Sequence, residues 1–160
     1  MASDSRPLIE AAVDYSETLK SNLTAIGLPD SAVSFLLGVW NLTQVFDDAA
    51  DGGTIARHDL DRAIWFAFVG MATNAFYASH SQSITPILAA AVLKWQAADA
   101  AERAGKADAR SFIWRAGFYD LILIVACLCH GEEAAQSMGA TIMGMYGETL
   151  PDYLEEFANA

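Results

Sequence analysis

The sequence predicts an all-α protein, a single compact bundle of six or seven helices in one domain that spans residues 1–160. Apolar residues recur with the helical period of about 3.6 residues along most of the chain. No segment alternates apolar and polar residues between turn signals, as a half-buried strand would. Glycines and prolines divide the chain into segments of helical length. Apolar residues make up 54 % of the chain and charged residues 18 %, which excludes a disordered chain.

The first half of the chain predicts three helices and one irregular stretch. Pro7 suits the first turn of a helix, and Gly27 with the following proline ends that helix. Asp30 or Ser31 caps the next helix, which ends at a pair of glycines. Residues 71–83 mix polar and aromatic side chains, so we expect a loop or a broken turn there. The helices are expected at 5–26, 30–51 and 57–70.

The second half predicts the remaining helices. Pro86 predicts the start of a helix, because the missing N–H of proline costs little in a first turn. Gly105 and Gly131 end helices, and the acidic pair after Gly131 suits the positive N-terminus of the next helix. The expected helices cover 85–105, 107–130 and 132–147, and a last short helix follows Pro151.

The charge and cysteine content limit the partners and the compartment. The chain carries 20 acidic and 9 basic residues, a formal charge of −11. Nucleic acids and anionic membranes bind basic surfaces, so the sequence predicts neither as a partner. The longest apolar stretch, 116–129, is shorter than the about 20 residues of a membrane span. Asp120 interrupts this stretch, and we expect it to pair with a basic residue of another helix. With no signal peptide near the start and with Cys127 and Cys129 as its cysteines, we expect a cytoplasmic protein with reduced thiols.

The apolar content favours self-association. A small domain with this much apolar sequence has surface left for a partner. We therefore expect a homo-oligomer, and the first functional hypothesis is a non-enzymatic, self-associating interaction or assembly protein. A different protein partner is left open under this hypothesis. Tryptophans at helical spacing serve as core anchors or as oligomer-interface residues, and here they are Trp40, Trp65, Trp95 and Trp114.

The most distinctive local feature is an acidic cluster at the end of the second predicted helix. Asp47, Asp48 and Asp51 fall within one turn of each other, on or near one face of that helix. Like charges at this spacing repel, and a divalent cation would relieve the repulsion. The alternative is a solvated helix end, with the glycine pair 52–53 as its C-terminal turn.

Residues 47–51, with the sequence DDAAD, resemble the DDxxD motif of class I isoprenoid synthases. The resemblance implies that Asp47, Asp48 and Asp51 hold Mg²⁺ ions, which in that family bind the diphosphate of the substrate. The second functional hypothesis is therefore a Mg²⁺-dependent enzyme that acts on a diphosphate-containing substrate.

Residues 46–60, with the sequence FDDAADGGTIARHDL, also resemble an EF-hand calcium loop. The resemblance places Asp48 at the first ligand position, Gly53 at the obligatory glycine and Asp59 at the final bidentate position. Ala50 and Gly52 then occupy the third and fifth ligand positions and supply no side-chain oxygen. The resemblance implies a degenerate loop at 48–59 that binds Ca²⁺.

A second carboxylate pair, Asp99 and Glu102, lies where the apolar stripe of the predicted helix 85–105 would continue. Two helices that each present such a pair loosely resemble the all-α nucleoside triphosphate pyrophosphohydrolases. The resemblance implies that Asp99 and Glu102 oppose the first cluster across a Mg²⁺ site. The alternative is a pair of exposed acids at the helix end, each paired with Arg103 or Lys106.

Overall fold

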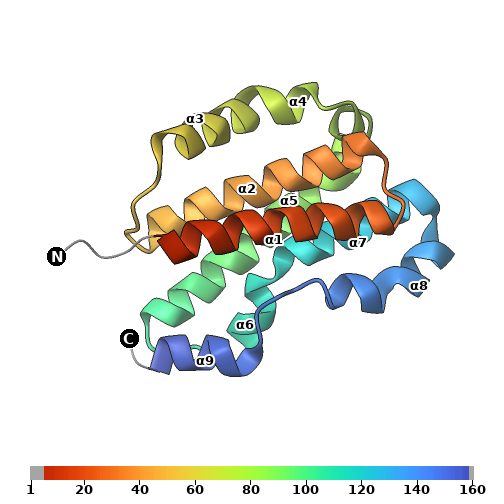
Figure 1. Cartoon of the computed structure of the whole chain (residues 1–160). Coiled ribbons are helices and arrows are strands. Elements are labelled where there is room, and N and C mark those ends of the chain that lie inside the picture. The colour runs from red at the N-terminus through yellow and green to blue at the C-terminus, as the bar shows by residue number, and fades with distance from the viewer. Residues whose placement is uncertain (1–5, 159–160) are drawn as a thin grey trace. The chain divides into compact units, whose positions relative to one another are not determined.

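The computed structural model describes the backbone of residues 6–158 and the side chains of residues 15–158. All regular structure in this part of the chain is helical, which confirms the all-α prediction (Figure 1). The elements in chain order are α1 (Arg6–Ala25), α2 (Asp30–Ala50), α3 (Arg57–Trp65), the π-helical turn η1 (Phe66–Gly70), α4 (Met71–Thr73), α5 (Ala75–Arg103), α6 (Ala109–Arg115), α7 (Gly117–His130), α8 (Glu132–Met143) and α9 (Leu150–Ala158).

The expectation of a single bundle needs a correction. The described residues divide into two compact units, the first ending at Ser79 and the second beginning at His80, and α5 contributes to both. The helices of this part of the chain also outnumber the predicted six or seven. The predicted helix 107–130 breaks at Ala116 into α6 and α7, and the predicted loop 71–83 is almost entirely helical.

Asn74 explains why α5 begins before Pro86. Its backbone is extended (φ −68°, ψ 124°), and its Oδ1 accepts a hydrogen bond from the N–H of Tyr77 at 3.0 Å, which is the pattern of an N-cap. Its Nδ2 donates to the carbonyl of Ser31 at 2.9 Å and so ties the cap to α2. Pro86 therefore lies inside α5 rather than at its start, and the helix lacks one backbone hydrogen bond at that point.

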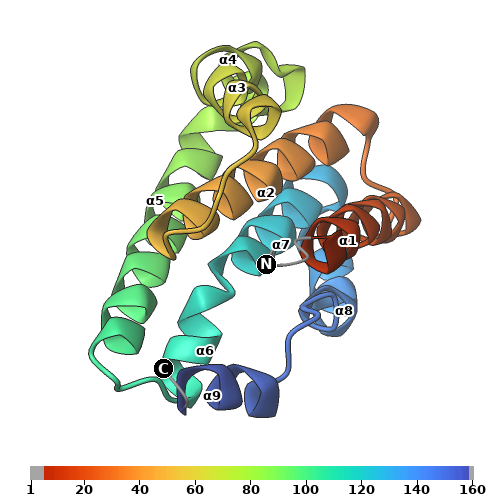
Figure 2. The ribbon, with the colours of Figure 1, turned by 60° about the vertical axis from the view of Figure 1, so that its left-hand side comes forward.

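In the first unit, α1 and α2 pack as an antiparallel hairpin (Figures 1 and 2). Gly27 makes the turn with a φ of 77°, a conformation that favours glycine. The rings of Tyr15 and Trp40 pack 5.4 Å apart across the hairpin. α3 and η1 pack against α2. The most buried side chains of this unit are Leu19, Leu23, Ala32, Phe35 and Leu36.

In the second unit, α7 and α8 form a hairpin that turns at Gly131, and α9 packs against α6 (Figure 2). Gly117 allows α7 to approach α5 closely, because a Cβ at this position would lie 3.2 Å from the Cβ of Ala91. The most buried side chains of this unit are Ile84, Ala98, Leu121, Ile122, Val125, Ala126 and Tyr153.

In the described part of the chain, no single helix is both long enough and apolar enough to cross a bilayer. α6 and α7 reach that length and apolarity only as a pair, and the pair is bent by 47°. Asp120 lies in the first turn of α7, and its side chain is 56 % exposed. Its Oδ2 lies 2.5 Å from Nζ of Lys94 on α5, which confirms the predicted ion pair with another helix.

Candidate functional site

The most unusual surface of the described residues lies on α3 and η1. Leu60, Ile64, Trp65 and Phe68 are 39 %, 50 %, 66 % and 80 % exposed. Their spacing of four, five and eight residues from Leu60 places them on one side of the helix. We call these four residues the α3–η1 surface. Solvated apolar side chains in a continuous group are typical of protein interaction sites.

The opposite side of α3 and η1 is anchored to α2. Ala63 is 8 % exposed, and the ring of Phe66 lies directly over Gly38 of α2. A Cβ at Gly38 would lie only 2.1 Å from Cε2 of Phe66, so the ring occupies the space that a side chain at this position would need. The residues that fix α3 and η1 in place therefore differ from those that form the exposed surface.

The backbone of this surface is itself uncommon. Residues Phe66–Gly70 form a π-helical turn between two α-helical segments. Such turns are rare and occur often at functional sites. Phe66 and Phe68 both belong to η1, and the first contacts α2 while the second is exposed to solvent.

The segment that carries the α3–η1 surface has no net charge, although the protein as a whole is acidic. Arg57 pairs with Asp61 at 3.0 Å, and Arg62 pairs with Asp59 at 2.6 Å. Residues 57–73 thus carry two positive and two negative side chains, a formal charge of 2 − 2 = 0, whereas the whole chain carries −11. The run 63–93 contains no Asp, Glu, Lys or Arg at all.

The predicted acidic cluster forms the end of α2. Gly52 adopts a φ of 71°, and the N–H of Gly53 donates to the carbonyl of Asp48 at 2.8 Å. The glycine pair 52–53 therefore forms the C-terminal turn of α2, as the alternative interpretation of this segment predicted. Partial burial raises the pKa of Asp48, and the negative charges of Asp51 and Asp59 raise it further. The carboxylates of Asp51 and Asp59 therefore lie close enough to Asp48 to disfavour its charge.

These carboxylates do not converge on a common point. Among the described residues, no three His, Cys, Asp or Glu side chains are placed to hold a metal ion. Asp48 lies within α2 and Asp59 lies in the first turn of α3, where Arg62 binds its carboxylate. Asp47, also in α2, is partly buried, and Asp51 is exposed.

The second predicted pair, Asp99 and Glu102, separates into two different environments. Asp99 Oδ2 lies 2.9 Å from a guanidinium nitrogen of Arg103, an ion pair of the kind that the alternative interpretation predicted. The Glu102 side chain is 4 % exposed, and Arg115 of α6 binds its Oε2. Sequence spacing alone gave no sign of this burial.

Glu102 belongs to a buried polar network that joins α5, α6 and α9. The hydroxyl of Tyr153, which is fully buried, lies 2.6 Å from Glu102 Oε1 and 2.7 Å from Ser111 Oγ. A phenol carries one proton, so Tyr153 donates it to the carboxylate and accepts from the serine hydroxyl. Burial and the neighbouring Glu102 raise the pKa of Tyr153 to about 12. Among the described residues, every fully buried side-chain nitrogen and oxygen has a hydrogen-bond partner, those of the network included.

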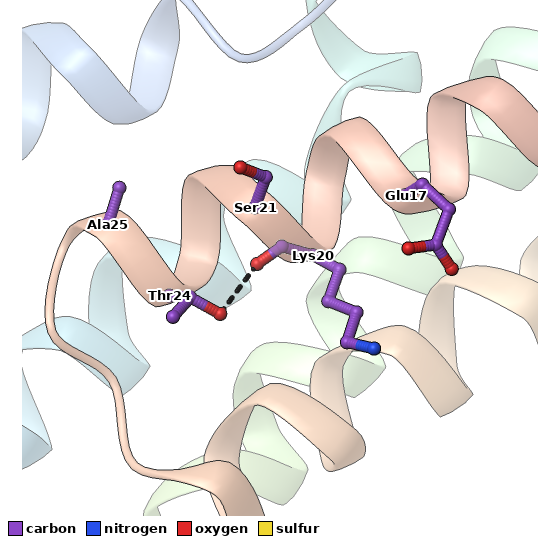
Figure 3. Close-up of a pocket in the computed structure, with 5 residues that line it drawn as sticks. All are labelled: Glu17, Lys20, Ser21, Thr24 and Ala25. Carbon is purple, nitrogen blue, oxygen red and sulfur yellow. Dashed lines mark hydrogen bonds between the residues drawn. The ribbon is translucent and has the colours of Figure 1, made fainter.

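One hollow lies on the outer face of α1, with a volume of about 410 Å³ (Figure 3). The lysine ammonium and the serine hydroxyl point to different sides of the helix in Figure 3, and Thr24 Oγ1 donates to the carbonyl of Lys20 at 2.8 Å. A ligand site needs enclosing walls with polar groups that converge, and this hollow has neither. Its lining residues are Glu17, Lys20, Ser21, Thr24 and Ala25.

The sequence and the structure were compared with known proteins. No model of a protein family, no curated protein and no solved structure matches this chain. Function is therefore inferred from the geometry. The α3–η1 surface was not predicted from the sequence, although two signals mark it: the four-residue spacing of Leu60, Ile64 and Phe68, and the charge-free run 63–93.

Proposed function

We propose that this protein is a self-associating helical protein and that its α3–η1 surface binds a second copy of the chain. The observation that carries the proposal is the exposure of Trp65 and Phe68, which are 66 % and 80 % exposed on one side of α3 and η1. Aromatic residues of this kind supply most of the binding energy in protein interfaces.

Charge supports a second copy as the occupant. Two copies that each carry a formal net charge of −11 repel each other wherever their acidic faces meet. The segment 57–73 is neutral, and its four charged side chains are already paired within α3. Two copies that meet at this surface bring no unpaired like charges together.

The size of the surface favours a weak, concentration-dependent dimer. A buried aromatic residue contributes on the order of 200 Å². At the observed exposures, Trp65 and Phe68 leave on the order of 300 Å² per copy for an interface. With Leu60, Ile64 and the surrounding atoms, a symmetric pair reaches on the order of 1,000 Å² in total, the lower end of specific interfaces.

Sedimentation equilibrium tests the proposal over a wide range of protein concentration. The native chain should change from monomer to dimer as the concentration rises. Phe68→Glu should raise the dissociation constant at least about tenfold, because it places a charge in an apolar interface. Met143→Glu is the matched control, since Met143 is 73 % exposed but lies on α8. A native chain that stays monomeric, or equal weakening by both variants, would overturn the proposal.

A second candidate function is divalent cation binding by the segment 48–59. The observation that favours it is the repulsion that Asp51 and Asp59 exert on Asp48, which a bound cation would relieve. Thermal unfolding with Ca²⁺ or Mg²⁺ tests it. A cation at 100 times its dissociation constant should stabilise the native chain by roughly 2.7 kcal/mol and should have no such effect on Asp48→Asn. Unchanged unfolding of the native chain with every cation would contradict this candidate.

The Mg²⁺-dependent diphosphate enzyme rests on the DDAAD sequence of residues 47–51 alone. The same unfolding measurement with Mg²⁺ and inorganic pyrophosphate together tests it. Stabilisation that requires both components would support this function, and stabilisation by neither would contradict it.

A further inference from the structure

We infer that the two copies pair antiparallel through α3 and η1, so that Phe68 of one copy packs on Leu60 of the partner subunit. This inference rests on the proposed self-association. It specifies a two-fold symmetric contact centred on Ile64, in which each copy presents the same surface to the other.

The shape of the α3–η1 surface favours the antiparallel arrangement. Leu60 at the start of the surface is 39 % exposed and Phe68 at its end is 80 % exposed, so less apolar side chain stands out at the start (the flat end) than at the end (the bulky end). Antiparallel pairing places the bulky end of each copy on the flat end of the other, which fills space evenly. Parallel pairing would press Phe68 on Phe68 of the partner subunit and hold the flat ends apart.

The distribution of charge favours the same arrangement. A parallel pair would place Arg57 beside Arg57 of the partner subunit, and Asp61 beside its equivalent. In an antiparallel pair that crosses at Ile64, Arg57 lies on the side of the uncharged Met71 of the partner subunit and Asp61 on the side of its uncharged Ala67, so neither faces its own equivalent. Opposed helix dipoles add a small favourable contribution.

The spacing of the surface residues suits a crossed contact. Leu60, Ile64 and Phe68 form a ridge at four-residue intervals, and such ridges pack into the grooves of a neighbouring helix at a crossing angle of about 50°. The ridge extends over eight residues, roughly 12 Å along the axis. Trp65 lies beside this ridge and is exposed enough to cover the edge of the contact.

Photo-crosslinking of the full chain tests the arrangement. Phe68 is replaced by the photoreactive residue p-benzoylphenylalanine, the protein is irradiated at concentrations that give dimer, and the covalent dimer is digested with trypsin. Cleavage after Arg57, Arg62 and Lys94 separates the peptide 58–62, which contains Leu60, from the peptide 63–94, which contains Phe68. The same replacement at Leu60 gives the reciprocal experiment, and replacement of Met143 on α8 is the control.

The antiparallel arrangement predicts that the probe at position 68 attaches mainly to peptide 58–62 and that the probe at position 60 attaches mainly to peptide 63–94. Attachment of the probe at position 68 to peptide 63–94 of the partner subunit, and of the probe at position 60 to peptide 58–62 of the partner subunit, would overturn the antiparallel arrangement. It would leave the proposed self-association intact. A chain that sediments as a monomer at every concentration and gives no covalent dimer would overturn both.

Discussion

The two units use their surfaces in opposite ways. In the second unit, hydrogen bonds between largely buried polar side chains hold α9 against α5 and α6. These side chains are Glu102, Ser111, Arg115 and Tyr153. In the first unit, α3 and η1 lie on α2 through small and aromatic groups, and their outer side leaves Phe68 80 % exposed. The network of the second unit fixes one geometry, because its polar groups are bonded to one another. The α3–η1 surface of the first unit leaves apolar area unburied.

This difference shows what each region contributes. A buried network of this kind costs desolvation and gains specificity only when every member is bonded, so it suits a permanent internal contact. Covering a neutral apolar surface of this size gains only a modest free energy and brings no like charges together, so it suits a contact that forms and dissociates.

The largest effect is expected at Glu102. Glu102→Ala removes the buried carboxylate that binds Arg115, whose side chain is only 16 % exposed. We expect the free energy of unfolding to fall by about 3–5 kcal/mol. Asp99→Ala is the matched control on the same helix, because its partner Arg103 is 71 % exposed, and it should cost no more than about 1 kcal/mol. Urea unfolding measures both, and equal losses would contradict the assigned role of Glu102.

A smaller loss is expected for Tyr153→Phe, which removes one buried hydrogen bond to a charged group. The cost should be about 2 kcal/mol at neutral pH. Because the folded-state pKa of Tyr153 is raised to about 12, its protonated phenol stabilises the fold below the ordinary pKa of about 10, and this stability is lost as the pH rises through about 12. The difference in stability between the native chain and the variant should therefore shrink over this pH range. A difference that stays constant would show that Tyr153 does not titrate as described.

The anchoring of α3 and η1 to α2 is tested by Gly38→Ala. The new methyl group overlaps the ring of Phe66, so the ring must move, and the loss of packing should exceed the gain in helix propensity by about 1 kcal/mol. Gly139→Ala on α8 is the control, because no atom lies within 4 Å of its added Cβ, and it should stabilise by roughly 0.5–1 kcal/mol. If both variants are stabilised equally, Phe66 is not held against Gly38.

The smallest effect is expected at Asp48. Its raised pKa means that the folded protein disfavours the carboxylate, so this group lowers stability above pH 4 and the penalty disappears as the pH falls below that value. Asp48→Asn should raise the free energy of unfolding by a few tenths of a kcal/mol at pH 7 in the absence of cations, because the site is largely exposed to solvent. A clear loss of stability at pH 7 would contradict the described repulsion.

Local sequence signals predicted the fold class and several helix ends. The glycines at 27, 52, 105 and 131 each adopt a positive φ at the end of a helix, which is why these boundaries could be read from the sequence. The break at Ala116 has no such signal, and the course of α5 through Pro86 depends on a contact with a distant residue. Asn74, for example, caps α5 while it also binds the carbonyl of Ser31.

The site residues were harder to predict than the fold. The spacing of Asp99 and Glu102 indicated a shared face, but the sequence could not show that Arg115 and Tyr153 meet Glu102 in space. The reverse holds for the α3–η1 surface. Its apolar residues are visible in the sequence, but an apolar helix face predicts burial, and only the structure shows that Ala63 and Phe66 face α2 while Phe68 does not.

Hydrogen–deuterium exchange at rising protein concentration tests the central claim most directly, because it shows where a second copy binds. The account predicts that exchange of the amides in residues 57–70 slows as the concentration rises, while exchange in α9 stays constant. Exchange in residues 57–70 that does not depend on concentration, or a slowing confined to another helix, would contradict the claim that the α3–η1 surface binds a second copy.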